Sequence, residues 1–337
     1  MQPIIEVKDL SRIFKIKGKW GLGPSKIVEA LRGISFQVKT GEIFGLLGPN
    51  GAGKTTTLKI LTTLLAPTNG QAHVLGFNTF GQEKQIRPRI NFIFGGEKGF
   101  YWRLNAVETL TFFSDLYEIP PAIQAQRIPK LLDLVGLSAI DAKREIETYS
   151  KGMKQKVQIA RGLVNDPEVI FYDEPSIGLD PVSAKNFREI VKQLASRGKT
   201  IILTTHYMAE AEELCDTIAV IDQGRILTCD STANIVAGLS DESATLHVSV
   251  TALTAEKKSV LDRIRSEYPV AVTPAGEDRV DLRIHFPSQA AAREKSAALF
   301  SELEALELHI EKPTLEQAYL NLIQHRNPDG VASIPNH

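Results

Sequence analysis

The chain has little cysteine and no excess of charge of either sign. Cys215 and Cys229 are the only cysteines among its 337 residues. Two are too few for a disulfide framework, so we expect free thiols in a reducing compartment. The 39 Lys and Arg residues against 40 Asp and Glu residues leave a net charge of -1. Because no overall basic field attracts phosphate backbones, we expect no nucleic-acid partner.

Long hydrophobic runs are also missing. The best apolar runs, residues 169–172 and 201–203, have the length of buried strands, whereas a helix that crosses a bilayer needs roughly 18 apolar residues. Residues 1–10 carry charges in place of the apolar segment of a signal peptide, so we expect no export of the chain. A role at a membrane would therefore require another chain to supply the channel.

Residues 4–238 have the pattern of an α/β domain. Short β-rich runs alternate with amphipathic helical stretches, which predicts a largely parallel sheet covered by helices. One interruption, residues 15–26, is rich in Gly and Lys and is predicted to be a loop.

The pattern changes at about residue 239. Strands are expected near residues 246–250, 270–272, 280–286 and 308–310, with helices before residue 270 and at about 288–306. The order strand-helix-strand-strand-helix-strand is that of a ferredoxin-like unit. We therefore predict a small α+β C-terminal domain over residues 239–325, closed by a helix at 314–323 and followed by a disordered tail at 326–337.

A phosphate-binding loop follows the strand predicted at residues 42–47. The loop reads Gly-Pro-Asn-Gly-Ala-Gly-Lys-Thr and leads directly into a helical run, as a P-loop requires. Its backbone N–H groups and the helix N-terminus are suited to a phosphate. Lys54 is expected to reach the β- and γ-phosphates, and the Thr55 hydroxyl to bind Mg²⁺. The predicted nucleotide-binding residues are Gly48, Pro49, Asn50, Gly51, Ala52, Gly53, Lys54, Thr55 and Thr56.

Two carboxylates end the apolar strand predicted at residues 169–172. Asp173 is suited to the Mg²⁺ shell, and Glu174 is suited to polarise an attacking water. Carboxylates are costly to bury, so a pair of them at this place indicates chemistry. The guanine-reading pattern Asn-Lys-x-Asp is missing from the sequence, which favours ATP over GTP.

Residues 149–153, Tyr-Ser-Lys-Gly-Met, precede a helical stretch between the P-loop and the carboxylate strand. Here the chain resembles the ABC transporter ATPases, whose Ser-Gly-Gly signature binds the γ-phosphate of ATP held by the opposite subunit. Ser150 is a good N-cap, and the free N–H groups of a helix start make an anion site. The resemblance assigns Ser150, Lys151 and Gly152 to a nucleotide bound in trans, although Lys151 stands where the family has its first Gly.

The resemblance continues on both sides of this signature. Asp180 matches the family's D-loop, which couples the two sites of a dimer, and it is placed to cap the helix that Pro181 opens. His206 follows an apolar strand, as the family's switch histidine does. Phe14 aligns with the aromatic residue that stacks on adenine, and Trp20 in the lysine-rich stretch is the alternative.

One family residue is missing. A Gln that reaches Mg²⁺ and senses the permease normally lies between the P-loop and the signature, but Gly96 occupies its place. Glycine has no side chain that could bind a metal, so we expect either the neighbouring Glu97 or a water to replace it. The aromatic run at residues 100–104 lies in the helical subdomain that the resemblance implies at about residues 92–165. It is either core or part of a groove for a permease helix.

The resemblance implies an ABC cassette of the P-loop NTPase class, with a mostly parallel sheet, antiparallel N-terminal strands and a helical subdomain. Lys54, Glu174 and His206 are the expected catalytic residues. ATP and Mg²⁺ are the expected ligands. The implied assembly is a dimer beneath a separate integral-membrane permease, peripheral to the cytoplasmic face of the cell membrane.

The sequence gives weaker evidence on the direction of transport and leaves two other functions open. Residues 313–319 resemble the end of a C-terminal domain of drug- and antibiotic-exporter ATPases, which favours export. The alternatives are a soluble ABC ATPase that remodels ribosomes or DNA ends, and a nucleotide-binding regulatory module. The cargo and the choice between a homodimer and a heterodimer stay open.

Overall fold

The computed structural model describes residues 2–16, 26–95, 99–237, 244–251, 253–275, 279–311 and 314–326. The chain divides into two compact units, Met1–Ser231 and Thr232–His337, and each is described by itself. The domain boundary predicted at residue 238 falls outside the described residues and stays a prediction.

A six-stranded sheet forms the centre of the first unit, in the order β10-β9-β3-β8-β7-β6. Its strands are β3 (Ile43–Leu47), β6 (Ile90–Phe94), β7 (Val169–Asp173), β8 (Thr200–Thr205), β9 (Thr217–Asp222) and β10 (Arg225–Ser231). The strands from β9 to β6 are parallel, whereas β10 pairs antiparallel with β9. Every residue of β3 and β8 is buried, as expected for parallel strands covered on both faces. The predicted parallel sheet is confirmed.

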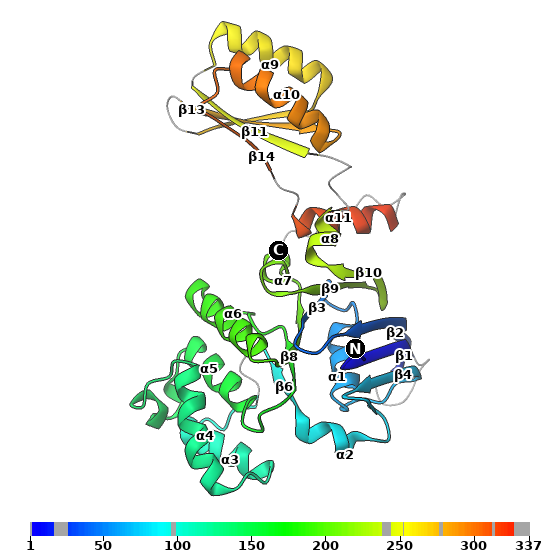
Figure 1. Cartoon of the computed structure of the whole chain (residues 1–337), viewed down its shortest axis with the longest axis vertical. Coiled ribbons are helices and arrows are strands. Elements are labelled where there is room, and N and C mark those ends of the chain that lie inside the picture. The colour runs from blue at the N-terminus through cyan, green and yellow to red at the C-terminus, as the bar shows by residue number, and fades with distance from the viewer. Residues whose placement is uncertain are drawn as a thin grey trace. The chain divides into compact units, whose positions relative to one another are not determined.

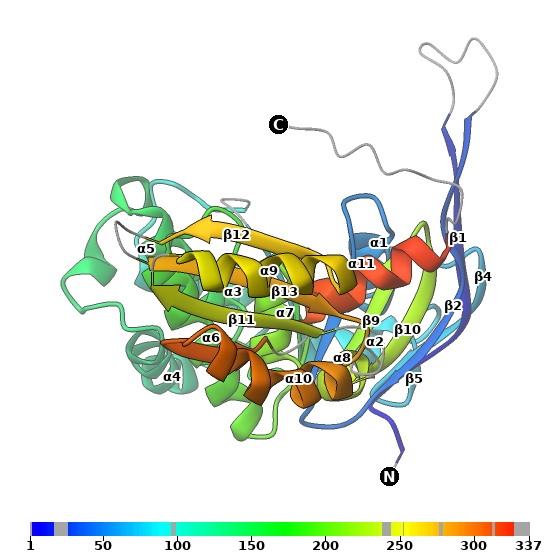
Figure 2. The same ribbon diagram turned by 90° about the horizontal axis from the view of Figure 1, so that it is seen from above.

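The second sheet of this unit is antiparallel, in the order β2-β1-β4-β5. Its strands are β1 (Ile5–Ile16), β2 (Lys26–Val38), β4 (Asn69–Val74) and β5 (Phe77–Asn78). Strands β1 and β2 form a long ribbon (Figure 2) in which Lys15 pairs with Ile27. Our prediction of a loop from residue 15 to residue 26 was therefore wrong at both ends, because cross-strand pairing overrides the weak strand preference of Lys. Residues 17–25 lie outside the described part of the chain.

The main core of the first unit holds the helix α1 (Lys54–Leu61) against both sheets. Leu58, Ile60 and Leu61 of α1 are fully buried and pack with side chains of β1, β3, β4 and β7. Phe36 of β2 stacks on Phe44 of β3 with ring centroids 5.1 Å apart. The helix that follows the P-loop is thus held between the two sheets, and this packing sets the position of its N-terminus.

Three helices, α3 (Ala106–Leu116), α4 (Pro121–Leu134) and α5 (Lys151–Arg161), pack on one another (Figure 1). Their starts are set locally, by a capping box of Asn105 and Glu108, by Pro121 and by the Ser150 side chain. They lie within the stretch predicted as the helical subdomain, whose bounds stay a prediction. The remaining helices are α2 (Glu83–Ile86), α6 (Pro181–Ser196) and α7 (Met208–Leu214), with 3-10 turns at Arg87–Arg89, Asp141–Lys143 and Ile146–Thr148.

The second unit contains a four-stranded antiparallel sheet in the order β12-β13-β11-β14. In chain order its elements are α8 (Thr232–Ala237), β11 (Ala244–Thr251), α9 (Ala255–Glu267), β12 (Val270–Pro274), β13 (Arg279–Phe286), α10 (Gln289–Glu302), β14 (Glu307–Ile310) and α11 (Leu315–Arg326). Helices α9 and α10 cover one face of the sheet (Figure 1), and alternate strand residues such as Leu246, Val248 and Leu282 are buried there. From β11 to β14 this is the order strand-helix-strand-strand-helix-strand that the sequence predicts.

Two ends in this unit differ from expectation. Helix α10 stops at Glu302, before the predicted residue 306, because Glu304 adopts a left-handed φ of 47° that no helix can continue. Helix α11 runs to Arg326, the first residue of the predicted tail, and residues 327–337 lie outside the described part. Within the described ranges of both units, no helix combines the length and apolar character needed to cross a bilayer.

We expect Phe44→Ala to lower the free energy of unfolding by about 3–5 kcal/mol, because the change removes a fully buried ring and leaves a cavity in the core. Chemical denaturation followed by circular dichroism measures this loss. Phe80→Ala is the matched control, because the Phe80 side chain is 63% exposed and its removal should cost less than about 0.5 kcal/mol. Equal losses in the two variants would contradict the position assigned to the core.

Candidate active site

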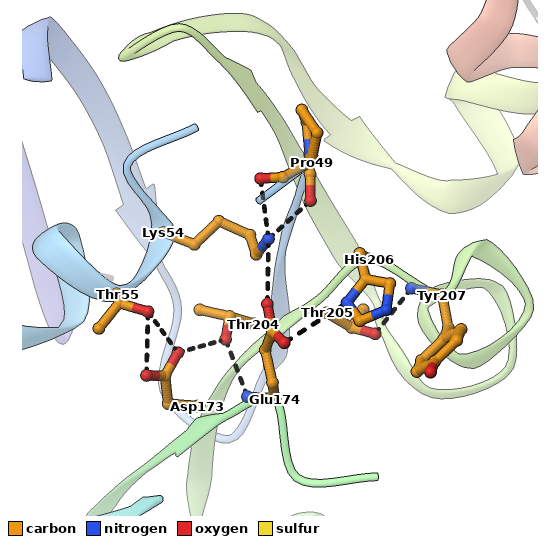
Figure 3. Close-up of polar contacts among 10 residues, drawn as sticks. Pro49, Lys54, Thr55, Asp173, Glu174, Thr204, Thr205, His206 and Tyr207 are labelled. Atoms are coloured by element: carbon orange, nitrogen blue, oxygen red, sulfur yellow. Dashed lines mark hydrogen bonds and ion pairs between the residues drawn. The ribbon is translucent and has the colours of Figure 1, made fainter. Parts of the chain in front are cut away.

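The predicted catalytic residues Lys54, Glu174 and His206 meet at the carboxyl ends of β3, β7 and β8 (Figure 3). These three strands are parallel neighbours in the order β3-β8-β7, so their carboxyl ends lie at the same edge of the sheet. The P-loop leaves β3, the two carboxylates Asp173 and Glu174 end β7, and His206 follows β8. Such an edge is where ligands bind in open α/β sheets.

The P-loop curls so tightly that two of its glycines have no room for a side chain. A Cβ at Gly48 would lie 2.1 Å from the Ile221 carbonyl oxygen, and one at Gly53 would lie 2.7 Å from that of Ala30. Gly53 also has a φ of 113°, which favours glycine. The loop closes around a cavity of about 140 Å³. Its lining residues are Ala30, Pro49, Asn50, Gly51, Gly53, Lys54, Thr55, Thr56 and Glu174.

Lys54 is a buried cation held by three oxygens. Its side chain is only 4% exposed. Its Nζ donates to the carbonyl oxygens of Gly48 (2.6 Å) and Pro49 (3.1 Å) and lies 3.2 Å from Oε1 of Glu174. A buried ammonium group is tolerated only with such partners. The arrangement holds this positive charge at the P-loop, and the predicted contact of Lys54 with the β- and γ-phosphates stays a prediction.

Oxygen ligands for a cation gather beside Lys54. The Thr55 hydroxyl lies 3.0 Å from both carboxylate oxygens of Asp173, and the Thr204 hydroxyl donates to Asp173 Oδ1 at 2.8 Å. The same Thr204 oxygen accepts the backbone N–H of Glu174 at 3.0 Å. A hydroxyl and a carboxylate are the hard oxygen donors that Mg²⁺ prefers, so this set fits that ion.

Glu174 stands in a strained backbone conformation. Its φ is 50°, a left-handed value that costs a non-glycine residue about 1–3 kcal/mol. The carboxylate is pointed at Lys54 on one side and at His206 on the other, with its Oε2 3.5 Å from His206 Nδ1. Gly95 supports this turn: its N–H donates to the Asp173 carbonyl oxygen at 2.8 Å, and a Cβ there would lie 2.1 Å from the Glu174 carbonyl oxygen.

The signature residues are not brought to this cavity. Ser150 caps α5 by accepting the Met153 N–H at 3.2 Å, and Gly152 lies so close to α6 that a Cβ would meet Ser183 Oγ at 2.4 Å. Asp180 caps α6, accepting the N–H groups of Val182 and Ser183, each at 3.0 Å, as predicted for the helix start. Lys151 is exposed at the start of α5. None of the predicted signature residues lines the P-loop cavity of its own chain.

The residues predicted to stack on adenine or to replace the missing Gln are not found in the P-loop cavity or lie outside the described residues. Phe14 on β1 lies under the Arg12 guanidinium, 4.7 Å from ring centroid to Cζ, and is not among the residues that line the P-loop cavity. Trp20, Gly96 and Glu97 fall outside the described residues, so their predicted roles stay predictions. Sequence reasoning missed Thr204 and Gly95, whose roles depend on the pairing of β8 and β6 with β7.

Comparison with known proteins agrees with this geometry. The sequence model of the ABC transporter family matches residues 31–177. The linearmycin resistance ATP-binding protein LnrL of Bacillus subtilis is 34% identical over 298 residues, which cover 87% of this chain and 93% of the relative. The chain belongs to the ABC transporter ATPase family.

Other ABC transporter relatives match about two thirds of the chain. A fluoroquinolones export ATP-binding protein of Mycobacterium tuberculosis is 43% identical over 223 residues, 66% of this chain and 71% of the relative. An uncharacterised ABC transporter ATP-binding protein of Nostoc sp. is 42% identical over 229 residues, 68% of this chain, and the match spans 66% of that relative's length. A dimeric ATP-binding cassette solved in a post-hydrolysis state with ADP and Pi superposes on 67% of this chain with a TM-score of 0.59 and 25% identity, covering 98% of that chain.

In this ABC ATPase, Thr204→Val should raise the Mg²⁺ concentration for half-maximal ATP hydrolysis by roughly tenfold, because a residue that orients a metal ligand typically contributes about 10–100-fold to metal affinity. The change removes the hydroxyl that holds Asp173 and the Glu174 N–H. Titration of ATPase rate against Mg²⁺ measures the shift. Thr204→Ser keeps the hydroxyl and should behave as wild type, and a shift of the same size in both variants would rule out the hydroxyl as its cause.

Proposed function

We propose that this chain is the ATP-hydrolysing subunit of an exporter with a separate permease, at the cytoplasmic face of the membrane. The observation that carries the proposal is the convergence of Lys54, Thr55, Asp173, Glu174 and His206 at one sheet edge (Figure 3). The relatives whose names state a function are resistance and export ATP-binding proteins, which supports export. The alternative of a remodelling factor gains no support from these relatives.

Phosphate binding is the task we assign to the P-loop. Its N–H groups and the N-terminus of α1 supply positive potential, and Lys54 adds a full positive charge. Glu174 compensates only part of this charge, because P-loop carbonyl oxygens also accept hydrogen bonds from Lys54. Thr55 and Asp173 would hold Mg²⁺, which supplies charge neutralisation for the phosphates when bound. Thr204 keeps Asp173 oriented by its hydrogen bond.

Hydrolysis needs a base and a group that stabilises the developing charge. The Glu174 carboxylate is placed to accept a proton from an attacking water, because its backbone turn directs it into the P-loop cavity. His206, 3.5 Å away, is placed to stabilise charge on the transferring group and to orient Glu174. The left-handed backbone of Glu174 is strained and persists because surrounding contacts hold it, among them the hydrogen bond from its N–H to the Thr204 hydroxyl.

The second half of each site is assigned to a second copy. Ser150, Lys151 and Gly152 lie at the N-terminus of α5, outside the P-loop cavity of their own chain. A partner subunit packed head to tail would present these residues to the phosphates, and Asp180 would lie beside the same contact, since Gly152 adjoins Ser183. The dimeric cassette among the similar structures supports this assembly.

Glu174→Gln should bind ATP with nearly unchanged affinity and hydrolyse it about 100-fold more slowly, because the amide keeps the shape but cannot accept the proton. Phosphate release and binding of a fluorescent ATP analogue separate the two effects. Lys54→Ala is the contrasting variant and should lose binding itself, since Lys54 is the buried cation of the P-loop. Hydrolysis by Glu174→Gln at the wild-type rate would exclude Glu174 as the base.

A groove for the permease is the role we propose for a second cavity of the first unit. This cavity of about 970 Å³ lies between the central sheet and the helical region and is lined largely by aromatic and apolar side chains. Of the aromatic run predicted as core or groove, Phe100 is 8% exposed and Tyr101 is 53% exposed, and both line the cavity. The resemblance to ABC transporters supports a short permease helix as its occupant.

Tyr101→Ala should reduce co-purification of the permease by roughly tenfold while leaving the ATPase domain folded, because exposed aromatic side chains in a groove are typical binding hot spots. Affinity purification from detergent-solubilised membranes of the native cell measures the effect. Trp102 is a matched control, because it is also exposed, at 40%, but does not line the cavity and instead contacts Lys154. If Trp102→Ala releases the permease and Tyr101→Ala does not, the groove is wrongly placed.

A further inference from the structure

A carboxyl group is buried directly behind the switch histidine without a hydrogen-bond partner. Glu210 lies in the first turn of α7 and is 6% exposed. Neither of its carboxylate oxygens is hydrogen-bonded to any of the described residues. A buried polar group without a partner costs about 1–3 kcal/mol, so packing alone gives no reason for a Glu at this place.

Two hydroxyls lie near Glu210, that of Thr205 at the end of β8 and that of Ser176 in the turn after β7. Thr205 ends β8 and precedes His206, and Ser176 follows Glu174 by two positions. Both hydroxyls lie close enough to Glu210 to act on its pKa, although neither forms a hydrogen bond that meets normal geometry. Glu210 therefore lies between the segment of Glu174 and the segment of His206.

Thr205 is hydrogen-bonded to the backbone next to His206. The Thr205 oxygen accepts the Tyr207 N–H at 3.0 Å, which leaves the Thr205 proton available for Glu210. The rings of His206 and Tyr207 are in contact, with centroids 4.1 Å apart (Figure 3). A bond from Thr205 to Glu210 would thus fix the loop that presents His206 to Glu174.

Charged groups from the neighbouring elements also face Glu210. Burial raises the pKa of its carboxyl, whereas the two hydroxyls, Arg188 of α6 and His206 oppose the rise. At the other end of α7, burial raises the pKa of the Cys215 thiol, and Glu210 adds to the rise. Arg188 is itself paired with Glu213, 2.7 Å from Nε to Oε2, so it does not neutralise Glu210 alone.

We propose that Glu210 is a positioning residue for hydrolysis, whose buried carboxyl binds the Thr205 and Ser176 hydroxyls when the site closes and so holds His206 in register with Glu174. This rests on the proposed ATPase function. Hydrogen bonds of a resting site are often long and tighten only when substrate is bound. Misplacement of a catalytic group by about 1 Å can cost about 100-fold in rate, so a residue outside the cavity can control turnover.

Glu210→Ala should lower kcat by roughly 10–100-fold and leave the Kd for ATP within about twofold, because the P-loop is not touched. Glu210→Gln keeps an acceptor of the same shape and should retain most of kcat. Steady-state ATPase rates and binding of a fluorescent ATP analogue to the purified full chain provide the two numbers. Thermal unfolding of each variant shows whether it is folded.

Glu213→Ala is the matched control on the same helix. Its carboxylate ties α7 to α6 through Arg188 and Lys192, at 2.7 and 3.1 Å, but is 46% exposed, unlike that of Glu210. It should leave kcat within about twofold of wild type. Equal losses of kcat in Glu210→Ala and Glu213→Ala, or wild-type kcat in Glu210→Ala, would overturn the proposal.

Ser176→Ala decides the matter if Glu210→Ala does not fold. It removes one hydroxyl that faces Glu210 and should lower kcat severalfold at unchanged Kd, with no further loss when combined with Glu210→Gln. Wild-type kcat in Ser176→Ala would then overturn the proposal. If the wild-type protein hydrolyses no ATP, alone or with its permease, the proposed function is overturned. If the wild-type protein hydrolyses ATP and Glu210→Ala has the same kcat, only the positioning role is overturned.

Discussion

The site depends on one constraint, the parallel pairing of β3, β8 and β7 in adjacent positions. It brings Thr55 within 3.0 Å of Asp173, although 118 residues separate them along the chain. In the β7–β8 register Asp173 is opposite Thr204, and the hydrogen bond between them follows from that pairing. A slip of one residue would turn the Asp173 side chain to the other face of the sheet and separate the carboxylate from the P-loop.

Charge compensation is the second requirement, because the site holds ionic groups at low exposure. Lys54 is 4% exposed and Glu174 is 19% exposed, and each would be costly to bury alone. Lys54 and Glu174 compensate each other's charge through their contact at 3.2 Å. The Gly48 carbonyl oxygen adds a partner for Lys54, and the His206 ring adds one for Glu174. A bound phosphate would compete with Glu174 for Lys54, so nucleotide binding would weaken the contact between Lys54 and this carboxylate.

The sequence was sufficient for the features that are encoded locally. Each of these features depends on residues that are neighbours in the sequence. They are the P-loop, the helix starts at Ser150 and Asp180, and the apolar strand before Asp173. Thr204 and Gly95 could not be found in this way, because their roles depend on which strands lie beside β7. Glu210 could not be found either, because its burial depends on how α7 packs in the folded chain. The extent of the β1–β2 ribbon was missed for the same reason, since cross-strand pairing rather than composition keeps Lys15 extended.

The signature helix is connected to the catalytic carboxylate of its own chain. Gln155 of α5 is 6% exposed and donates to the Pro175 carbonyl oxygen at 3.0 Å, and Pro175 directly follows Glu174. The start of the same helix touches α6 at Ser183, beside the cap formed by Asp180. If a partner's phosphate binds at the N-terminus of α5, any displacement of that helix acts on the backbone that holds Glu174 in its strained turn. Since packed elements move as units rather than deforming continuously, each nucleotide would thereby influence the geometry of the other site.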